Sequence, residues 1–154
     1  MTESGEFAVP LKMRAHHLYC GRYIPRYFAE QRGPVYKQVE AEMINAISPG
    51  NSQLVELVLG VDMLCPVCPE CRNNRCEHPK GNEEEVRKWD AIICKEMDWK
   101  YGTVLTGGEW WDLAEKKRPL DFCRRCNLLK DCSLIPTLKK QGRLTPDHWA
   151  MKLP

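Results

Sequence analysis

The stretch CPVCPECRNNRC, residues 65–76, holds four of the chain's nine cysteines within twelve residues. Three explanations fit so dense a group of thiols: disulfide bonds, a zinc site, or an iron–sulfur cluster with thiolate ligands. The spacing C-x2-C-x2-C-x4-C is close to the bacterial ferredoxin run C-x2-C-x2-C-x3-C-P, although it has one extra residue and Glu77 in place of the proline. Structural zinc sites more often pair two C-x2-C knuckles across a longer insert, so the spacing favours iron–sulfur over zinc.

The start of the chain, MTESGEFAVPLKMRAHH, bears on the disulfide explanation. It has no early positive charge followed by an apolar run, and no small-residue cleavage site of the kind that ends a signal peptide. We therefore expect a cytoplasmic protein, in a compartment that keeps thiols reduced. An odd number of cysteines cannot all pair within one chain, which also favours a metal over disulfides.

Length and composition predict one domain over residues 1–154, with residues 1–10 and 141–154 as tails. At 43% hydrophobic and 29% charged residues, the chain has the composition of a globular protein. It has no apolar run near the ~20 residues of a membrane-spanning helix, so we expect no membrane association. The net charge is +2, and the basic residues late in the chain alternate with acidic ones, so we do not expect a nucleic-acid partner.

Apolar periodicity predicts a mainly α fold with a short β element, in a small domain built around the cysteine loops. Helices are expected over 34–47, over 83–97 with Asn82 as its cap and Gly102 near its end, and from about 109 to Pro119. Residues 54–59 form the only convincing strand. The expected buried stripes are Val35, Val39, Met43 and Ile47 in the first helix, Val86, Trp89, Ile93 and Met97 in the second, and Trp110, Leu113 and Ala114 in the third.

A second cysteine group follows the third helix. Its sequence is DFCRRCNLLKDC, with Cys123, Cys126 and Cys132 spaced C-x2-C-x5-C. A C-x2-C turn directs two thiolates to one ion or one cluster face, and its N–H groups can hydrogen-bond to sulfur. Two such groups are a strong indication of metal binding, but they are weaker evidence for which metal is bound.

Together with the opening RAHHLYC at residues 14–20, these groups resemble an uncharacterised family of small cysteine-rich prokaryotic proteins suspected of binding iron–sulfur clusters. The resemblance covers about residues 11–135 and rests on R-x-H-H-L-x-C, on D-x-x-C-x-x-C-P at 62–69, on the single Cys76 and on the closing C-x2-C-x5-C. It implies the metal ligands Cys20, Cys65, Cys68, Cys76, Cys123, Cys126 and Cys132. In this pattern Cys20 is the fourth ligand beside Cys65, Cys68 and Cys76, whereas Cys71 and Cys94 are additions of this chain.

Several of these residues have a plainer interpretation. Cys94 lies at the edge of the apolar stripe of 83–97, where a free cysteine packs as a small hydrophobe. His16 and His17 point about 100° apart on a helix and would rarely hold one metal together, but either is a candidate proton donor. Arg14 is a candidate cofactor-binding residue that balances the charge of a thiolate-ligated cluster, or a surface ion-pair partner.

The pattern predicts one or two iron–sulfur clusters, most simply [4Fe-4S], in redox or sulfur chemistry. Seven family-type ligands are one short of two complete sets of four cysteines, which raises the hypothesis of an open iron that binds substrate as a Lewis acid. Alternatively Cys71 or Cys94 completes the set and the protein transfers electrons. The partner would be a redox protein or a small sulfur-containing substrate. A zinc-stabilised interaction module without a redox role is the other hypothesis, and the sequence does not specify whether the protein is an enzyme.

Overall fold

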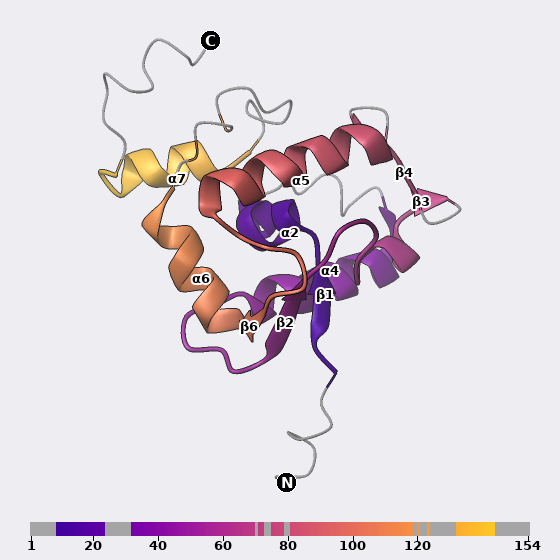
Figure 1. Ribbon diagram of the computed structural model, residues 1–154, viewed down its shortest axis with the longest axis horizontal. Helices are drawn as coiled ribbons and strands as arrows, with labels where there is room; N and C mark the ends of the chain where they lie inside the picture. The colour runs from indigo at the N-terminus through magenta and orange to yellow at the C-terminus, as the bar shows by residue number, and fades with distance from the viewer. Residues whose placement is uncertain are drawn as a thin grey trace, which may run out of the picture.

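Three short strands at one end of the molecule join segments that lie far apart in the sequence (Figure 1). β1 (Leu11–Met13) pairs in parallel with β2 (Leu54–Leu57), and β2 pairs antiparallel with β6 (Val104–Thr106). Val55 and Leu57 of β2 are fully buried because their side chains face the core. They alternate along the strand with the partly exposed Leu54 and Glu56, as expected for a strand with one buried face. The computed structural model describes residues 9–23, 32–69, 71–72, 75–78, 81–118, 120, 123 and 132–143.

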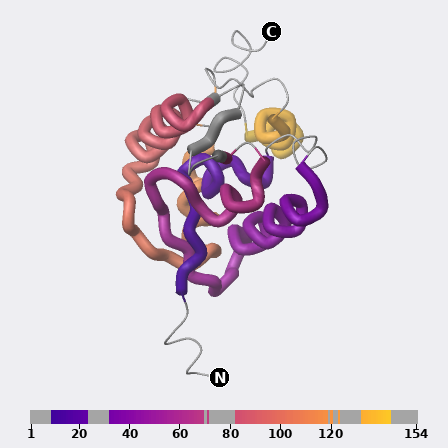
Figure 2. Tube along the Cα trace, turned by 90° about the vertical axis from the view of Figure 1, so that its right-hand side faces the viewer, coloured from indigo at the N-terminus to yellow at the C-terminus, as the bar shows by residue number. Residues whose placement is uncertain are grey.

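The segment between β1 and β2 carries the helix on which the site depends. α2 (Ala15–Cys20) continues into the 3-10 turn η1 (Gly21–Tyr23), and α4 (Pro34–Ala46) follows later in the chain. Figure 2 shows the indigo β1–α2 segment between α4 on one side and α5 (Glu83–Met97) on the other. α2 is therefore enclosed by the rest of the domain, and its residues Leu18 and Tyr19 are buried.

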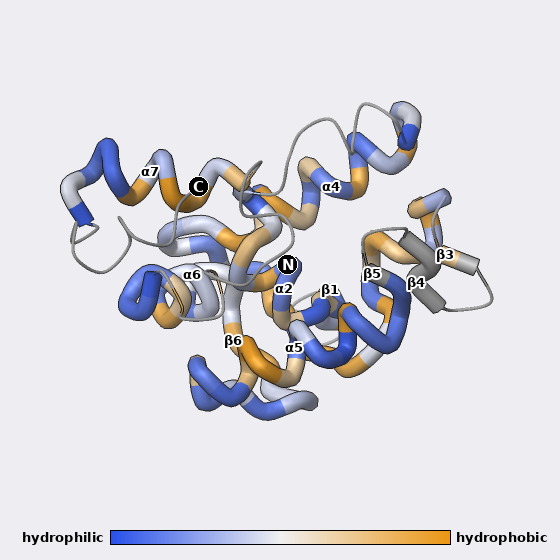
Figure 3. The backbone as a smooth tube through the Cα atoms, turned by 90° about the horizontal axis from the view of Figure 1, so that it is seen from above, coloured by the Kyte–Doolittle hydropathy of each residue, from blue (hydrophilic) through white to orange (hydrophobic). Residues whose placement is uncertain are grey.

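Two of the long helices begin at well-defined caps. The Asn82 side chain accepts a hydrogen bond from the Glu85 N–H at the start of α5, as the sequence predicted. At the start of α6 (Gly107–Lys116), the side chains of Thr106 and Glu109 form a reciprocal capping box. The last described helix is α7 (Leu134–Lys140). In Figure 3, α4 and α7 alternate between orange and blue along their length, as expected for helices with one buried face.

A second, smaller ladder follows the first cysteines. After the 3-10 turn η2 (Cys65–Val67), β3 (Cys71–Arg72) pairs antiparallel with β4 (Arg75–His78), and β4 pairs antiparallel with β5 (Gly81–Asn82). β5 leads directly into α5. The cysteine loop, which we define as residues 62–76, is thus held between the sheet strand β2 and the first turn of α5.

The mainly α fold with a short β element is confirmed, but the expectation of a single strand is wrong. The three-residue strands LKM and VLT are too short to show a period-two pattern, and only their pairing with β2 makes them strands. α6 begins at Gly107 rather than near Glu109, and α5 ends at Met97 before Asp98, whose φ is +60°, rather than near Gly102. Residues 1–8 and 144–154 of the predicted tails lie outside the described part.

The predicted buried stripe matches the buried face of the helix better for α5 than for α4. In α5, Val86, Ile93 and Met97 are buried and Trp89 is partly buried. In α4, Val35 is 61% exposed whereas Tyr36 and Glu40 are buried. Steps of four residues advance about 400° on a helix, so a stripe drawn at constant steps of four drifts off the core face over thirteen residues. Among the described helices, none has both the length and the apolar character needed to cross a membrane.

The start of α6 contains a close backbone approach that generates a prediction. A Cβ atom at Gly107 would lie 1.7 Å from the Ala46 carbonyl oxygen, while the Gly107 N–H donates to the Gln53 carbonyl at 2.7 Å. Gly107→Ala should therefore lower the free energy of unfolding by at least about 3 kcal/mol, because backbone must move to admit the methyl group. Asp112→Ala, at an exposed position of the same helix, should change it by less than about 0.5 kcal/mol. Urea denaturation compares the two, and equal midpoints would contradict the packing described.

Candidate metal centre

The cysteine loop places three of its cysteines on two consecutive turns. The Cys68 N–H donates to the Cys65 carbonyl at 3.0 Å, and the Cys71 N–H donates to the Cys68 carbonyl at 3.1 Å. Pro66 suits the first of these turns because its fixed φ fits a helical start and its missing N–H is not needed there. The repeated C-x2-C spacing therefore corresponds to two similar turns in succession.

The thiols of these turns lie close to one another. Burial raises the pKa of Cys71, and the neighbouring thiols of Cys68 and Cys65 also act on that pKa. Cys76 lies directly opposite Cys71 in the β3–β4 ladder; its side chain is outside the described part. Burial raises the pKa of Cys65 to about 12, with the nearby Asp62 carboxylate acting in the same direction. The thiol of Cys65 is therefore protonated at neutral pH unless a cation binds.

Asp62 organises the start of the loop. Its Oδ1 accepts the Leu64 N–H at 3.0 Å and faces the Cys65 thiol at 3.6 Å, while its own N–H donates to the Cys65 sulfur at 3.3 Å. Its Oδ2 accepts the Arg14 N–H at 2.8 Å and bonds to Nδ1 of His17 at 2.5 Å. Burial alone would raise the pKa of Asp62, but His17 and the N–H donors outweigh burial and hold that pKa well below its ordinary value. One ionised carboxylate thus connects the cysteine loop to β1 and α2.

Arg14 is fully buried, so the surface ion-pair interpretation of this residue is wrong. Only 1% of the residue is exposed, and its Nη2 donates to both carboxylate oxygens of Glu83, at 2.7 and 2.8 Å. Arg87 donates to the same carboxylate at 2.7 Å from a half-exposed position. The buried Nε and Nη1 atoms of Arg14 find no hydrogen-bond partner within the part of the chain that the structure describes. The positive charge of Arg14 favours the thiolate forms of both Cys65 and Cys71.

Each of the two adjacent histidines is held by its own carboxylate. His16 Nδ1 lies 2.8 Å from Asp90 Oδ1, which also accepts the His16 backbone N–H at 3.0 Å, and His17 is held by Asp62. The two rings lie 4.2 Å apart between centroids, tilted by 55°. Burial, and then the neighbouring His17, lower the pKa of His16, which favours its neutral form. A carboxylate at Nδ1 fixes the ring and leaves Nε2 as the outward atom of each histidine, the arrangement found in proton-transfer groups and metal ligands.

The second cysteine group lies near the other end of α2. Cys20 ends α2, and the Tyr23 carbonyl that follows accepts the Ser133 N–H at 3.0 Å, next to Cys132. Burial raises the pKa of Tyr19, and Cys123 and Cys20 raise it further, so both thiols lie within electrostatic range of that ring. Cys126 lies outside the described residues.

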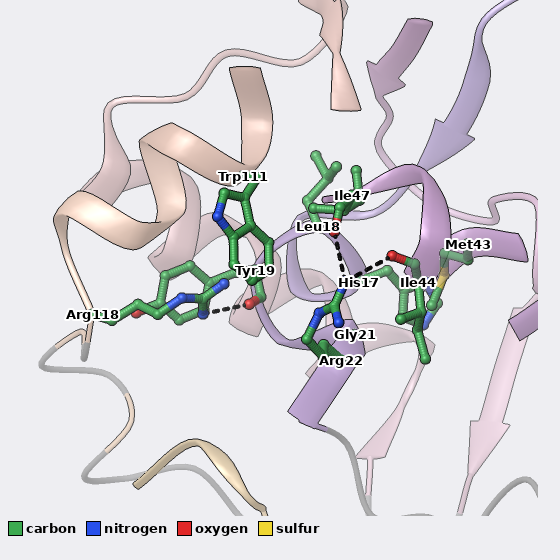
Figure 4. A pocket seen from close by; sticks show the side chains of 10 residues that line it. All are labelled: His17, Leu18, Tyr19, Gly21, Arg22, Met43, Ile44, Ile47, Trp111 and Arg118. Atoms are coloured by element: carbon green, nitrogen blue, oxygen red, sulfur yellow. Dashed lines mark hydrogen bonds between the residues drawn. The ribbon is translucent and has the colours of Figure 1, made fainter. Parts of the chain in front are cut away.

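Cys94 and the cavity beside His17 do not belong to either group. Cys94 is buried in the hydrophobic core, as expected for a packing role, and burial raises the pKa of its thiol. The cavity measures about 10 Å³, too small for a substrate (Figure 4). Its cationic side chains already donate to carbonyl groups, Arg22 to Ile47 at 3.2 Å and Arg118 to Tyr19 at 2.7 Å.

Sequence reasoning missed the three carboxylates Asp62, Glu83 and Asp90, although two signals were present. Asp62 opens the D-x-x-C-x-x-C-P motif, and Asp90 occupies the core-facing helical position between Val86 and Ile93, where an apolar residue would be expected. Within the described residues, no three or more His, Cys, Asp or Glu side chains are arranged to hold a metal ion. Cys126 and the side chains of Cys76 and His78 fall outside that part, as does His148.

The Arg14–Glu83 pair generates a prediction about stability. Glu83→Gln removes the carboxylate and leaves the Arg14 charge buried, which should lower the free energy of unfolding by about 3–5 kcal/mol. Glu84→Gln changes an exposed carboxylate in the same turn and should have an effect below about 0.5 kcal/mol. Chemical denaturation monitored by circular dichroism measures both. Equal stability of the two variants would mean that Arg14 is solvated in solution.

Comparison with known proteins gives a family but no characterised relative. A family model described as "Protein of unknown function (DUF1284)" matches residues 35–132, a range that holds both cysteine groups but begins after R-x-H-H-L-x-C. Neither curated proteins nor solved structures give a match. The resemblance to an uncharacterised cysteine-rich family is thereby confirmed, whereas its suspected iron–sulfur binding is not. Because the match covers more than half of its length, this chain belongs to the DUF1284 family of proteins of unknown function.

Proposed function

We propose that this protein binds an iron–sulfur cluster, most simply [4Fe-4S], at the cysteine loop, and acts in redox or sulfur chemistry. The observation that carries the proposal is the placement of Cys65, Cys68 and Cys71 on two consecutive turns beside the buried Arg14. Such a group supplies one-electron transfer when bound, or Lewis acidity where an iron lacks a cysteine ligand.

The chemistry of the donor set fits a negatively charged, thiolate-bound group. Two donors of a buried guanidinium with no partner in the described part would cost about 1–3 kcal/mol or more if nothing accepted their hydrogen bonds. Thiolate or sulfide sulfur next to Cys65 and Cys71 is a suitable acceptor, and hydrogen bonds to sulfur are one way in which proteins tune such groups. Arg14 is thus the proposed charge-balancing residue of the site.

The remaining residues of the site have roles that follow from their contacts. Asp62 fixes the Cys65 turn, and the carboxylates of Asp62 and Asp90 orient His17 and His16, the proposed proton-transfer residues. The lowered pKa of His16 favours a neutral ring that accepts a proton before it donates one. The partner is a redox protein or a small sulfur compound, in a compartment such as the cytoplasm that keeps thiols reduced. A zinc-stabilised interaction module is the second candidate, because the same thiols are good zinc ligands.

Metal analysis separates these two candidates. Protein purified without oxygen should contain iron and acid-labile sulfide in equal amounts, absorb broadly in the visible range, and give an electron-spin signal on reduction. Colourless protein that contains stoichiometric zinc, and that takes up no iron and sulfide on reconstitution, would exclude the iron–sulfur proposal and leave the zinc module.

The role of Arg14 can be tested without leaving Glu83 as an unbalanced charge. The double variant Arg14→Gln/Glu83→Gln leaves the net charge of the protein unchanged. It should retain iron, and its cluster should have a reduction potential tens of millivolts below that of the wild-type protein. Loss of the Arg14 cation disfavours the more negative reduced state, and loss of the Glu83 carboxylate acts in the opposite direction but more weakly, because Arg14 acts on Cys71 more strongly than Glu83 does. A tenfold change in a one-electron equilibrium corresponds to about 59 mV. Arg87→Gln removes a half-exposed cation from the same carboxylate and serves as the control. Identical potentials in all three proteins would exclude Arg14 from the site.

A further inference from the structure

We propose that metal binding draws the cysteines into two separate sites, Cys65, Cys68, Cys71 and Cys76 in one and Cys20 with Cys123 and Cys132 in the other. Without metal, the described cysteines of each set are not arranged around a common point, so the proposal concerns which thiols converge when metal binds. This partition rests on the proposed metal-binding function. It reverses two assignments that the family resemblance implied, because Cys71 becomes a ligand and Cys20 moves from the first cysteine group to the second.

The case for Cys71 rests on its position relative to three other cysteines. The Cys65 thiol is near enough to act on the pKa of Cys71, and the turn that ends at Cys71 starts at the Cys68 carbonyl. Residue 76 is its direct partner in the β3–β4 ladder. Opposite residues of an antiparallel ladder have Cα atoms only about 4.5–5.5 Å apart and share a face. The backbone therefore gathers all four positions of the 65–76 stretch at one place.

The case for moving Cys20 rests on the two ends of α2. Arg14, just before the helix, is bonded through its N–H to Asp62, which contacts Cys65. Cys20 ends the same helix six residues later, and at 1.5 Å per residue this separation is about 9 Å. The contacts that α2 makes with the cysteine loop are thus at its start, whereas Cys20 lies at its opposite end.

At that far end, the neighbours of Cys20 come from the second cysteine group. The Tyr23 carbonyl, three residues after Cys20, accepts both the N–H and the hydroxyl of Ser133, at 3.0 and 3.4 Å, beside Cys132. The Tyr19 hydroxyl donates to the Lys117 carbonyl at 3.2 Å, and the Cys123 N–H donates to the Leu120 carbonyl at 3.0 Å. Lys117 and Ser133 thus contact the end of α2 and the turn after it, and Cys123 lies near enough to Tyr19 to act on its pKa.

The partition has a functional consequence. The sequence motif adds Cys126 to the second group. Cys126 lies outside the described residues, so the partition is argued without it, and only the completeness of the second set depends on it. With Cys126 the eight cysteines make two four-thiolate sets, and the ninth, Cys94, packs in the core. Every iron then has a cysteine ligand in both sites. The proposed function accordingly narrows from general redox or sulfur chemistry to electron transfer between two fully cysteine-ligated centres.

Cobalt titration of the metal-free full-length protein without oxygen tests the grouping. Co²⁺ bound by several thiolates absorbs strongly through sulfur-to-metal charge transfer, so bound equivalents can be counted. The wild-type chain and the control Cys94→Ser should each bind two equivalents. Cys71→Ser and Cys20→Ser should each bind one.

Double variants then decide which cysteines share a site. Cys65→Ser/Cys71→Ser and Cys20→Ser/Cys123→Ser should each still bind one equivalent, whereas Cys71→Ser/Cys20→Ser should bind none. One equivalent in the wild type, two in Cys71→Ser, or one in Cys65→Ser/Cys20→Ser would overturn the partition. Circular dichroism on each variant identifies those that fail to fold.

Alkylation of the wild-type protein provides a measurement that needs no variant. With one equivalent of Co²⁺ added, mass spectrometry of iodoacetamide-treated protein should show Cys65, Cys68, Cys71 and Cys76 protected in the same molecules. Molecules in which Cys20 is protected together with Cys65, Cys68 and Cys76 while Cys71, Cys123 and Cys132 are alkylated would contradict the proposal. Cobalt reports the grouping whichever metal is native, so zinc in the purified protein would refute the iron–sulfur function while leaving the partition intact.

Discussion

The buried ion pair between Arg14 and Glu83 is the constraint on which the rest of the structure depends. It joins the end of β1 to the first turn of α5, across the cysteine loop, and both side chains are almost completely inaccessible to water. Removing two charges from water costs several kcal/mol for each ion, so the pair persists only because its geometry is good. Arg14 Nη2 contacts both Glu83 oxygens, and additional hydrogen bonds run from Arg87 to Glu83 and from the Arg14 backbone N–H to Asp62.

The surroundings of this pair hold Cys65 as a protonated thiol rather than as a reactive thiolate. Asp62 and burial raise the pKa of the Cys65 thiol, and Arg14 only partly offsets them. A nucleophilic cysteine needs the opposite environment, with a depressed pKa. Thiols that ionise only when a metal arrives are instead typical of metal ligands, whose binding releases protons. The electrostatics of the loop therefore agree with the chemistry that its spacing indicates.

The histidines show how a local motif acquires meaning from distant residues. On a helix, adjacent histidines diverge, and that argument correctly separates them into different environments. Each ring contacts its own buried carboxylate: His17 contacts Asp62 of the cysteine loop, and His16 contacts Asp90 of α5. The sequence contains both carboxylates, but nothing in their spacing from residues 16 and 17 indicates which histidine each one meets.

The amino-acid sequence by itself determined α5, with its Asn82 cap and apolar stripe, the main extent of α4 and α6, the strand at 54–57, and the C-x2-C turns. These features are set by local rules: apolar periodicity, side-chain caps and the fixed φ of proline. Only the tertiary structure decided that β1 and β6 are strands, that Arg14 is buried on Glu83, and that the turn after Cys20 meets the segment beside Cys132. Each of these features depends on contacts between residues tens of positions apart. The neighbouring sequence does not indicate such contacts, because the stabilising free energy depends on the distant partner and not on the local propensity of the residue.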